Sequence, residues 1–599
     1  MKIKSFFTFI IFFVFYEEIF SQTTILLPDE VVNAIINEVS GEQAFQNEML
    51  LGEREMNRPK QEYFENFRET DVILKLAKEY GFSDVYVEKF YTGDSLWDAV
   101  KAELVMVEPE KRLITSLDEI SASLCVGSRD VNVTAEVVYV GDGISDEDYD
   151  GKDISGKIVI ASGPADKVHS LAVYGYGALG IISYHSRGKY PDMVLWQRIK
   201  EKDSNEKSQT FGFMLSEKEG NKIVQKLLNG EKVVVNAYVD TEFYPPKQEV
   251  ITALIPGNGG NNQEFIFIAH LFEGLAKQGA NDNYSGSVCI LEVGRAIINL
   301  LKEQKIKQLK RNIRFLWVPE FIGTKQYLQK HSEEIKNMIC GINMDMVGED
   351  LVKCESVFIV SRTPDSLQSF INDVVQGFAE LTVKLNNDAL GLYPDNEYGV
   401  LSNKIVSPTG RKFPFFVSIE EFDGGSDNVV LNSNSVGVPT VYLECWPDDF
   451  YHSNLDLPDK TDPTQLKRVA FIGTASAVTI CSAEDDDLLN ITSECYSRAK
   501  MRLSDELRKS LYLLSKTEKD DLVRTFKNVK ILIKDAVMRE EENLLSIRKL
   551  DDNNIMNSYI KRLISQLEEE FKLIENELSE YYKLRCLKNG IYPDQSDKF

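Results

Sequence analysis

Five residues of types that bind metal ions or move protons lie far apart in the sequence. They are His270, Asp282, Glu320, Asp345 and His452. Zinc sites in proteins use histidine nitrogen and carboxylate oxygen, and a catalytic zinc keeps one position open. Two-metal hydrolases hold their ions about 3.5–4 Å apart, where one carboxylate can bridge both. The two histidines and two aspartates therefore predict a metal site, and Glu320 supplies a carboxylate that can take a proton from water.

The elements predicted around these residues would bring them together. Apolar runs predict strands at 264–270, 312–318, 340–347, 356–360 and 440–445, and helical spacing predicts helices at 285–302, 365–380 and 462–482. Alternating strands and helices indicate an α/β fold with a mostly parallel sheet flanked by helices. Ligands collect at the carboxyl ends of such strands. Because His270, Glu320 and Asp345 sit at or near strand ends, we expect them at one rim.

Four segments resemble the metal-binding segments of the co-catalytic zinc aminopeptidases, a family that includes glutamate carboxypeptidase. They read FIAHLFEGLAKQGANDNYSGSVCILEVGRAI, RNIRFLWVPEFIGTKQYL, GINMDMVGED and DFYHSNLDLPDK. Their order and spacing agree with the family across residues 248–484. The resemblance implies a zinc peptidase catalytic domain in that range, holding one or two Zn²⁺ ions.

The resemblance also implies a role for each candidate residue. His270 and His452 would be terminal ligands, one on each ion, and Asp282 would bridge the ions. The bond from Asp282 to the next residue is expected to be cis. Asp345 would bind one ion. Glu320 would be the general base that activates water for attack on a peptide carbonyl and then protonates the leaving amine.

Two residues depart from the family's pattern. Phe321 stands where the family has a second glutamate that binds metal, and Phe272 stands where it has an aspartate that orients the histidine. Glu273 is a candidate to replace the aspartate, and Glu349 or Glu421 is a candidate to replace the missing ligand. The alternatives are a single tightly held ion or a lost activity, since losing an orienting partner costs about 10–100-fold.

An acidic, glycine-rich stretch lies between the third and fourth of these segments. It reads SIEEFDGGSDNVVLNSNSVGVPTVYLE. The family often has Ser-Asp near its substrate pocket, so the resemblance places Ser426 and Asp427 there. Glu420, Glu421 or Asp423 would suit the α-ammonium group of a peptide, which favours an aminopeptidase. The alternative is an ordinary acidic surface loop.

The remaining chain divides into further regions. Residues 22–125 are expected to form the N-terminal part of the peptidase domain. The stretch GKDISGKIVIASGPADKVHSLAVYGYGALGIISY resembles a protease-associated domain, a β-rich, non-catalytic module inserted into peptidases, and we place it at 126–247. Residues 485–599 follow an acidic break. Apolar residues there step by three or four, which predicts a C-terminal helical region that packs on the body or on another copy.

The N-terminus predicts export. Lys2 and Lys4 precede an apolar run from Phe6 to Tyr16, which is typical of a signal peptide over residues 1–21 with cleavage near Ser21. The run is too short to span a bilayer well, so an anchor helix is the weaker alternative. We expect a secreted, periplasmic or extracellular protein.

Charge and cysteine content exclude several classes of binding partner and of cysteine site. The chain has 68 Lys and Arg against 94 Asp and Glu, a net charge of −26. Nucleic acids and anionic membranes attract basic patches, so neither is expected as a partner once the signal peptide is removed. Eight cysteines in 599 residues are too few for a disulfide scaffold, and the absence of a C-x-x-C pair argues against a cysteine zinc site.

The main functional hypothesis is an exported zinc-dependent exopeptidase, an aminopeptidase, acting on peptide substrates. A peptidase-like peptide-binding protein without turnover, a carboxypeptidase and a single-zinc cyclase-type relative remain alternatives. A homodimer through the C-terminal helices is a further expectation.

Overall fold

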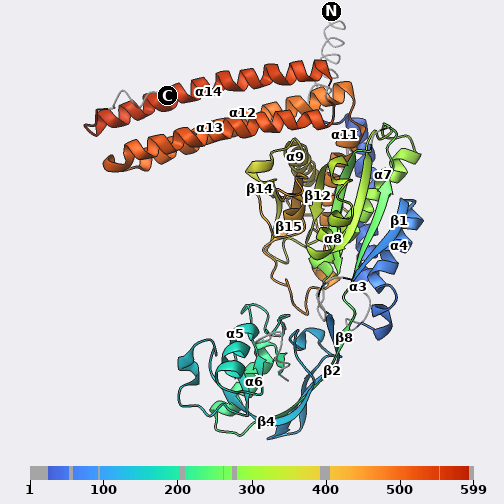
Figure 1. The fold of residues 1–599 in the computed structure, drawn as a ribbon, viewed down its shortest axis with the longest axis vertical. Coiled ribbons are helices and arrows are strands. Elements are labelled where there is room, and N and C mark those ends of the chain that lie inside the picture. The colour runs from blue at the N-terminus through green and yellow to red at the C-terminus, as the bar shows by residue number, and fades with distance from the viewer. Residues whose placement is uncertain are drawn as a thin grey trace, which may run out of the picture.

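The computed structural model describes residues 24–52, 58–91, 93, 95–200, 210–260, 262–272, 279–391, 405–551 and 553–592. The described residues form three parts, which Figure 1 shows one below the other. We call residues 96–244 the inserted unit and residues 485–588 the arm. The other described residues are the body. The predicted signal peptide, residues 1–21, lies outside the described residues.

The body is built on a sheet of eight strands within the described residues. Their order across the sheet is β1 (Ser83–Tyr91), β9 (Lys247–Ile255), β11 (Asn312–Pro319), β10 (Glu264–Phe272), β12 (Met338–Met344), β15 (Thr440–Trp446), β13 (Val357–Ser361) and β14 (Val417–Glu420). The neighbours β11–β10, β10–β12, β12–β15 and β13–β14 are parallel, and the other three pairs are antiparallel. The predicted α/β fold with a mixed, mostly parallel sheet is confirmed.

Alternation along β10 decides which face of the sheet carries His270. Phe265 and Phe267 pack into the largest core, whereas Ile266 and Ile268 pack into a smaller apolar cluster on the opposite face. Successive strand residues point to opposite faces. His270 therefore lies on the face of the smaller cluster.

Helices cover the two faces unequally. The largest core includes residues of α2 (Asp29–Glu38), α3 (Gly41–Gly52), α4 (Arg68–Tyr80), α7 (Gly286–Lys302), α9 (Ile371–Gly391) and α11 (Pro463–Ser482). The helices that pack into the smaller cluster are the short α8 (Ile322–Lys330) and α10 (Asn428–Leu431). The helical stretch Ala280–Lys302 is long and apolar enough to cross a membrane. Of its most apolar 18-residue window 83% is buried, as expected of a core helix.

The inserted unit has its own sheet. Its strands follow the order β3 (Arg112–Ser116), β2 (Leu96–Glu108), β8 (Val234–Tyr244), β4 (Val131–Tyr139), β5 (Ile158–Ala161), β6 (Gly180–Ser183) and β7 (Gly212–Met214). The unit also holds α5 (Ala165–His169) and α6 (Glu217–Leu228). β2 and β3 belong to this sheet, so the strands in residues 96–116, a range that the sequence assigns to the N-terminal part of the peptidase domain, are counted here with the inserted unit.

A two-stranded ribbon connects the inserted unit to the body. β2 and β8 pair antiparallel from Leu96–Tyr244 to Glu108–Val234. Figure 1 shows this ribbon descending from the body into the second sheet. The chain thus enters and leaves the inserted unit side by side.

The arm consists of long helices that project from the body (Figure 1). They are α12 (Asp485–Lys516), α13 (Leu522–Ser546) and α14 (Asn554–Lys588). Of the predicted apolar face of α14, Met556, Ile560, Leu563, Leu567, Ile574 and Leu578 are buried. α14 contacts α12 and α13 of the same chain, so this face is covered within the molecule.

Candidate metal centre

Three parallel strands bring His270, Glu320 and Asp345 to one edge of the sheet. His270 is near the end of β10, Glu320 follows β11, and Asp345 follows β12. The strand register sets His270 beside Val318, two residues before Glu320. One ligand-type atom from each of the three residues lies within 4.8 Å of the others. The residues that the sequence places at one rim therefore meet there.

Asp282 lies between the two histidines. Its Oδ1 is 3.3 Å from His270 Nε2, and its Oδ2 is 3.1 Å from His452 Nε2. Asp345 Oδ1 is 3.2 Å from the same nitrogen of His270. One carboxylate thus faces two imidazoles through its two oxygens, which is the arrangement expected of a carboxylate that bridges two ions.

The loop before α7 holds Asp282 by hydrogen bonds to its backbone. Asp456 accepts the backbone N–H of Asn281 at 2.8 Å and that of Asp282 at 3.1 Å. Asn283 donates through its side-chain nitrogen to the carbonyl oxygen of Met344 at 3.0 Å. The peptide bond between Asp282 and Asn283 is cis, as the resemblance implies. The loop is therefore fastened both to the end of β12 and to the segment after His452.

Glu320 stands in the turn between β11 and α8. The next residue, Phe321, has a φ of 55°, and its N–H donates to Asp427 Oδ1 at 2.7 Å. Thr324 donates to the same oxygen at 2.6 Å. The fully buried Asp427 therefore fixes the turn that carries Glu320. Burial raises the pKa of Glu320 to about 8, a range that suits a group that exchanges protons near neutral pH.

Phe321 packs, partly buried, against the smaller apolar cluster. A phenyl ring offers no ligand atom. Among the described residues, His452 is therefore joined by Asp282 but by no carboxylate from the turn after Glu320. Phe272 ends β10, and Glu273, a sequence-based substitute for the orienting aspartate, lies outside the described residues.

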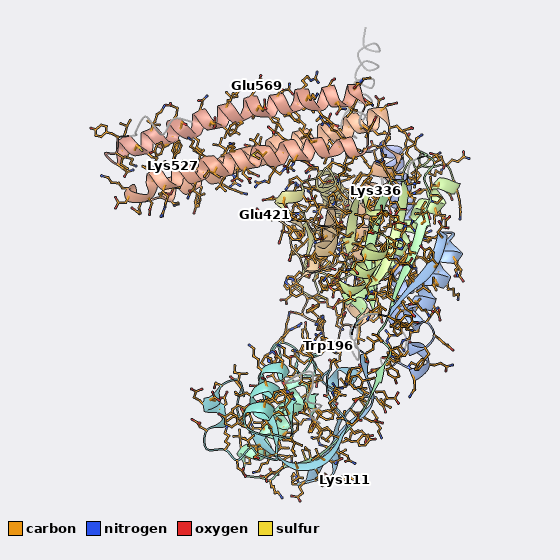
Figure 2. All side chains as sticks on the ribbon, in the orientation of Figure 1. Lys111, Trp196, Lys336, Glu421, Lys527 and Glu569 are labelled. Carbon is orange, nitrogen blue, oxygen red and sulfur yellow. The ribbon has the colours of Figure 1, made fainter. Side chains whose placement is uncertain are left out.

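His452 is held from the inserted unit. Its φ is 51°, and its side chain is 31% exposed, more than that of His270. The N–H of Trp196 donates to the His452 carbonyl oxygen at 2.8 Å. The Trp196 ring faces the His452 ring edge-on with centroids 5.3 Å apart, and the Tyr451 ring stacks on the His452 ring with centroids 3.7 Å apart. Figure 2 labels Trp196 where the inserted unit meets the body.

The other predicted residues lie at different distances from this centre. Glu349 meets Cys354 and Asp448 in a separate buried group. Glu421 follows β14, the edge strand four places from β10, which corresponds to about 19 Å at the usual strand spacing. Ser426 is fully buried next to Asp427, so neither presents its side chain to solvent.

Sequence reasoning missed one acidic side chain beside the centre. Met344 pairs with Leu443, so the next residues, Asp345 and Glu444, are neighbours. Leu443 packs into the largest core, which turns Glu444 to the opposite face, the face of His270. Glu444 is 8% exposed, and burial raises its pKa to about 7. A glutamate inside the strand-forming run TVYLECW was the available signal.

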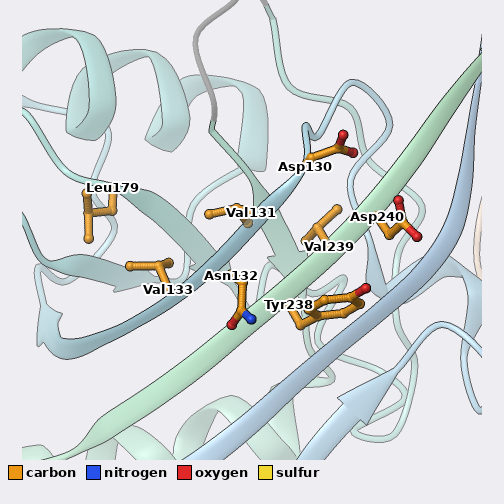
Figure 3. Close-up of a pocket in the computed structure, with 8 residues that line it drawn as sticks. All are labelled: Asp130, Val131, Asn132, Val133, Leu179, Tyr238, Val239 and Asp240. Atoms are coloured by element: carbon orange, nitrogen blue, oxygen red, sulfur yellow. The ribbon is translucent and has the colours of Figure 1, made fainter.

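A pocket of about 610 Å³ lies elsewhere, on β4 and β8 of the inserted unit (Figure 3). It is lined by Asp130, Val131, Asn132, Val133, Leu179, Tyr238, Val239 and Asp240. Asp130 already accepts hydrogen bonds from the N–H and hydroxyl of Thr241. The predicted site residues do not line this pocket, so it is separate from the candidate centre.

The donor set at the centre fits a zinc ion. His270, Asp282 and Asp345 are each only 4% exposed and offer one imidazole nitrogen and two carboxylates. Asp345 Oδ1 is buried and accepts no hydrogen bond. Buried carboxylates at such spacing need a cation or a proton to offset their repulsion. Imidazole with carboxylate is a ligand combination that zinc takes.

Comparison with known proteins agrees with this geometry. Residues 249–476 match the model of peptidase family M28, so the chain contains a domain of that metallopeptidase family. This confirms the predicted class, a metallopeptidase related to the co-catalytic zinc aminopeptidases. No curated protein shows a significant match.

Two solved structures share the fold. The zinc aminopeptidase BSAP from Bacillus subtilis is 19% identical, with 73% of this chain and 94% of that chain covered and a TM-score of 0.51. A peptidase M28 precursor from Shewanella amazonensis is 16% identical, with coverage of 76% and 96% and a TM-score of 0.53. At these identities the likeness describes the fold.

Proposed function

We propose that this protein is an exported zinc-dependent aminopeptidase that hydrolyses peptides from their free N-terminus. The observation that carries the proposal is the convergence, from four separate segments of a peptidase M28 domain, of His270, Asp282, Glu320, Asp345 and His452. The zinc aminopeptidase from Bacillus subtilis, which shares the fold, supports the choice of metal and of reaction.

In this proposal three residues hold the principal ion. His270, Asp282 and Asp345 supply three ligands, the number that leaves a catalytic zinc one open position. His452 and the second oxygen of Asp282 would hold a further ion with fewer protein ligands, because Phe321 stands where a carboxylate is expected. We therefore infer one tightly bound zinc and one weak position.

Glu320 would move the protons. Zinc bound at this centre would polarise the peptide carbonyl and lower the pKa of water. Glu320 would accept a proton from the attacking water and deliver it to the leaving nitrogen. Asp427 contributes by holding the turn of Glu320 through the Phe321 N–H, so we assign Ser426 and Asp427 to the buried wall behind the substrate pocket.

An acidic wall beside the centre supports the aminopeptidase assignment. Glu444 lies next to Asp345. Burial is the main cause of the raised pKa of Glu444, and the charges of Asp423 and Glu420 raise it further. A buried carboxylate stabilises an ammonium group strongly. We propose that Glu444 faces the α-ammonium group of the substrate.

One observation favours a second candidate, a peptidase-like protein that captures peptides without cleaving them. Phe321 removes a carboxylate from the position beside His452, and losing a metal ligand lowers activity more than losing an orienting partner. This candidate predicts peptide binding with no product formed.

Metal analysis and turnover separate the two candidates. The purified protein, assayed with aminoacyl and dipeptide substrates, is expected to hold zinc and to cleave peptides with a free N-terminus but not N-acetylated ones. Glu320→Gln should keep zinc and lower kcat by about 10²–10⁴-fold. A zinc-free protein, or equal turnover in wild type and Glu320→Gln, would contradict the proposal. Binding of peptides without turnover would favour the second candidate.

Export is the remaining part of the proposal. It rests on the basic and apolar composition of residues 1–21. N-terminal sequencing of the protein recovered outside the cytoplasm is expected to begin close to residue 22. An intact Met1 on the mature protein would contradict cleavage.

A further inference from the structure

A second group of ligand-type side chains is buried beneath the inserted unit. Glu349, Cys354 and Asp448 bring two carboxylates and one sulfur within 4.8 Å of one another. Glu349 and Cys354 are fully buried, and Asp448 is 5% exposed. Cys354 belongs to the same apolar cluster as Phe450 and residues of the inserted unit. The group therefore lies at the contact between body and inserted unit.

Glu349 is a buried carboxyl group whose negative charge must be offset. Both of its carboxylate oxygens are buried, and the polar groups that approach them are the Ser356 hydroxyl and the Asp448 carboxyl, neither of which carries a positive charge. A buried carboxylate without a partner costs several kcal/mol, so such groups are paired, protonated or bound to a metal. Burial and the nearby Asp448 also hold the pKa of Glu349 well above its usual range. One of its oxygens lies within 4.8 Å of Cys354 Sγ and of a carboxylate oxygen of Asp448.

The cations around this group are already engaged. Lys460 Nζ pairs with Asp459 at 2.6 Å, while the Lys460 carbonyl oxygen accepts a hydrogen bond from Cys354 Sγ at 3.7 Å. Arg187 donates to the backbone oxygens of Asp448 and Asp449, not to the carboxylates. Neither side chain therefore offsets the charge of Glu349 directly.

We propose that Glu349, Cys354 and Asp448 form a structural zinc site. Thiolate with two carboxylates is a zinc-type set, because the sulfur disfavours calcium and magnesium, which take oxygen ligands. Binding would release the thiol proton of Cys354 and any proton held on Glu349. A water molecule or the second oxygen of Glu349 would complete four ligands. A single cysteine carries no C-x-x-C motif, which explains why the sequence argues against such a site.

This site is separate from the candidate catalytic centre. Asn281 lies between them, donating to Asp448 Oδ2 at 3.1 Å while the next residue, Asp282, faces the histidines. The segments that carry the new ligands also hold the inserted unit. Lys189 of that unit pairs with Glu355 at 3.0 Å and with Asp449. An ion here would therefore fasten the body at the contact that positions the inserted unit.

Cobalt substitution tests the proposal through the sulfur. The full-length protein would be stripped with a chelator and loaded with Co²⁺, which gives a thiolate-to-metal absorption band only where a cysteine is a ligand. The band is expected in wild type and in a His270→Ala/Asp345→Asn variant, which empties the catalytic centre. It should vanish in Cys354→Ser. Retention of the band in Cys354→Ser, or its absence in wild type, would overturn the proposal.

Zinc content supplies the second readout. Cys354→Ser should lose one equivalent of zinc, whereas Cys481→Ser, a matched change at another buried cysteine in α11, should lose none. If Cys354→Ser does not fold, the nearly isosteric Glu349→Gln decides, with zinc affinity at this site lowered about 10-fold or more. Zinc content and affinity equal to wild type in Glu349→Gln would mean that Glu349 and Asp448 share a proton instead. Because the catalytic centre keeps its own ligands, peptidase failure and failure of this site are distinguishable.

Discussion

The backbone N–H of Trp196 donates to the carbonyl oxygen of His452 at 2.8 Å, and the two rings meet edge-on. Trp196 belongs to the inserted unit, and His452 belongs to the candidate metal centre. The neighbouring residues continue the contact, since Leu195 pairs with Ser453 in an isolated bridge. The inserted unit thus supports a proposed metal ligand directly.

This contact predicts a loss of activity on removing the indole. Trp196→Ala is expected to lower kcat/KM about 10-fold, within the range typical of residues that orient a ligand. Phe243→Ala, which removes a half-exposed aromatic ring from β8 of the same unit, serves as the control. Unchanged kcat/KM in Trp196→Ala would show that the ring contributes nothing to His452. Steady-state kinetics on a peptide substrate measures both variants.

We predict that a glutamate at the position of Phe321 increases zinc affinity. Phe321 stands where the resemblance implies a carboxylate ligand, so Phe321→Glu should raise the affinity for a second zinc ion at this centre by about 10-fold or more. Isothermal titration of the protein in which the Cys354 site and the first catalytic position are already filled measures this affinity. Phe321→Leu, which changes the ring without adding a ligand, should leave it unchanged. An equal affinity in both variants would argue against a second metal position at this place.

Glu444 predicts selectivity for a free N-terminus. Glu444→Gln removes the proposed partner of the α-ammonium group, so KM for unblocked dipeptides should rise by about 10-fold, as for loss of a charge-assisted hydrogen bond of roughly 1.4 kcal/mol or more. The kcat should change less. Glu420→Gln, at an exposed position, is the control. A larger effect of Glu420→Gln would move the assignment to that residue.

His169 predicts acid sensitivity of the inserted unit. His169 is fully buried, its Nε2 lies 2.9 Å from Thr210 Oγ1, and burial lowers its pKa to about 4. The unfolded chain binds the proton from about pH 6.5 downward and the folded chain only near pH 4. Stability is therefore complete above pH 6.5 and falls by about 3 kcal/mol between pH 6.5 and 4.

Hydrogen exchange of β5 and β6 at several pH values measures this loss locally. His169→Gln should remove most of the slope between pH 6.5 and 4. His185→Gln, which changes a half-buried histidine of the same unit, should retain it. The same slope in both variants would place the acid sensitivity in other groups.

Gly286 predicts a strict steric requirement at the start of α7. A Cβ there would lie 2.1 Å from the Met344 carbonyl oxygen and 2.3 Å from Asn283 Oδ1. Gly286→Ala should therefore lower the free energy of unfolding by about 3 kcal/mol and weaken zinc binding through the Asp282 loop. Gly175→Ala, whose Cβ would meet only Leu171 Cδ1 at 3.4 Å, is the control. Chemical denaturation compares the two.

Much of the body could be predicted because its signals are local. The apolar runs around His270 and Asp345 predict β10 and β12, and parallel neighbours must end at the same edge. The helical period of the arm likewise predicts the buried face of α14.

The missed features depend on contacts between distant segments. β2 pairs with β8, which lies more than a hundred residues later, so no local pattern marks Leu96 as the first residue of this sheet. Trp196 contacts the centre because the inserted unit packs against the body. Glu444 lies beside the centre because the register of β12 and β15 sets it next to Asp345. Cys354 is one cysteine among eight, and only the fold shows that Glu349 and Asp448 lie beside it.

The paired ribbon of β2 and β8 makes the inserted unit a cassette. Leu96 and Tyr244 are strand partners, so the chain leaves the body and returns to it at adjacent positions. A short turn that joins these two residues would replace the inserted unit without changing the order of the eight strands of the body. A different domain could also be inserted between the same two residues. Any such inserted domain would need its own contact to His452, because Trp196, which contacts His452, belongs to the inserted unit.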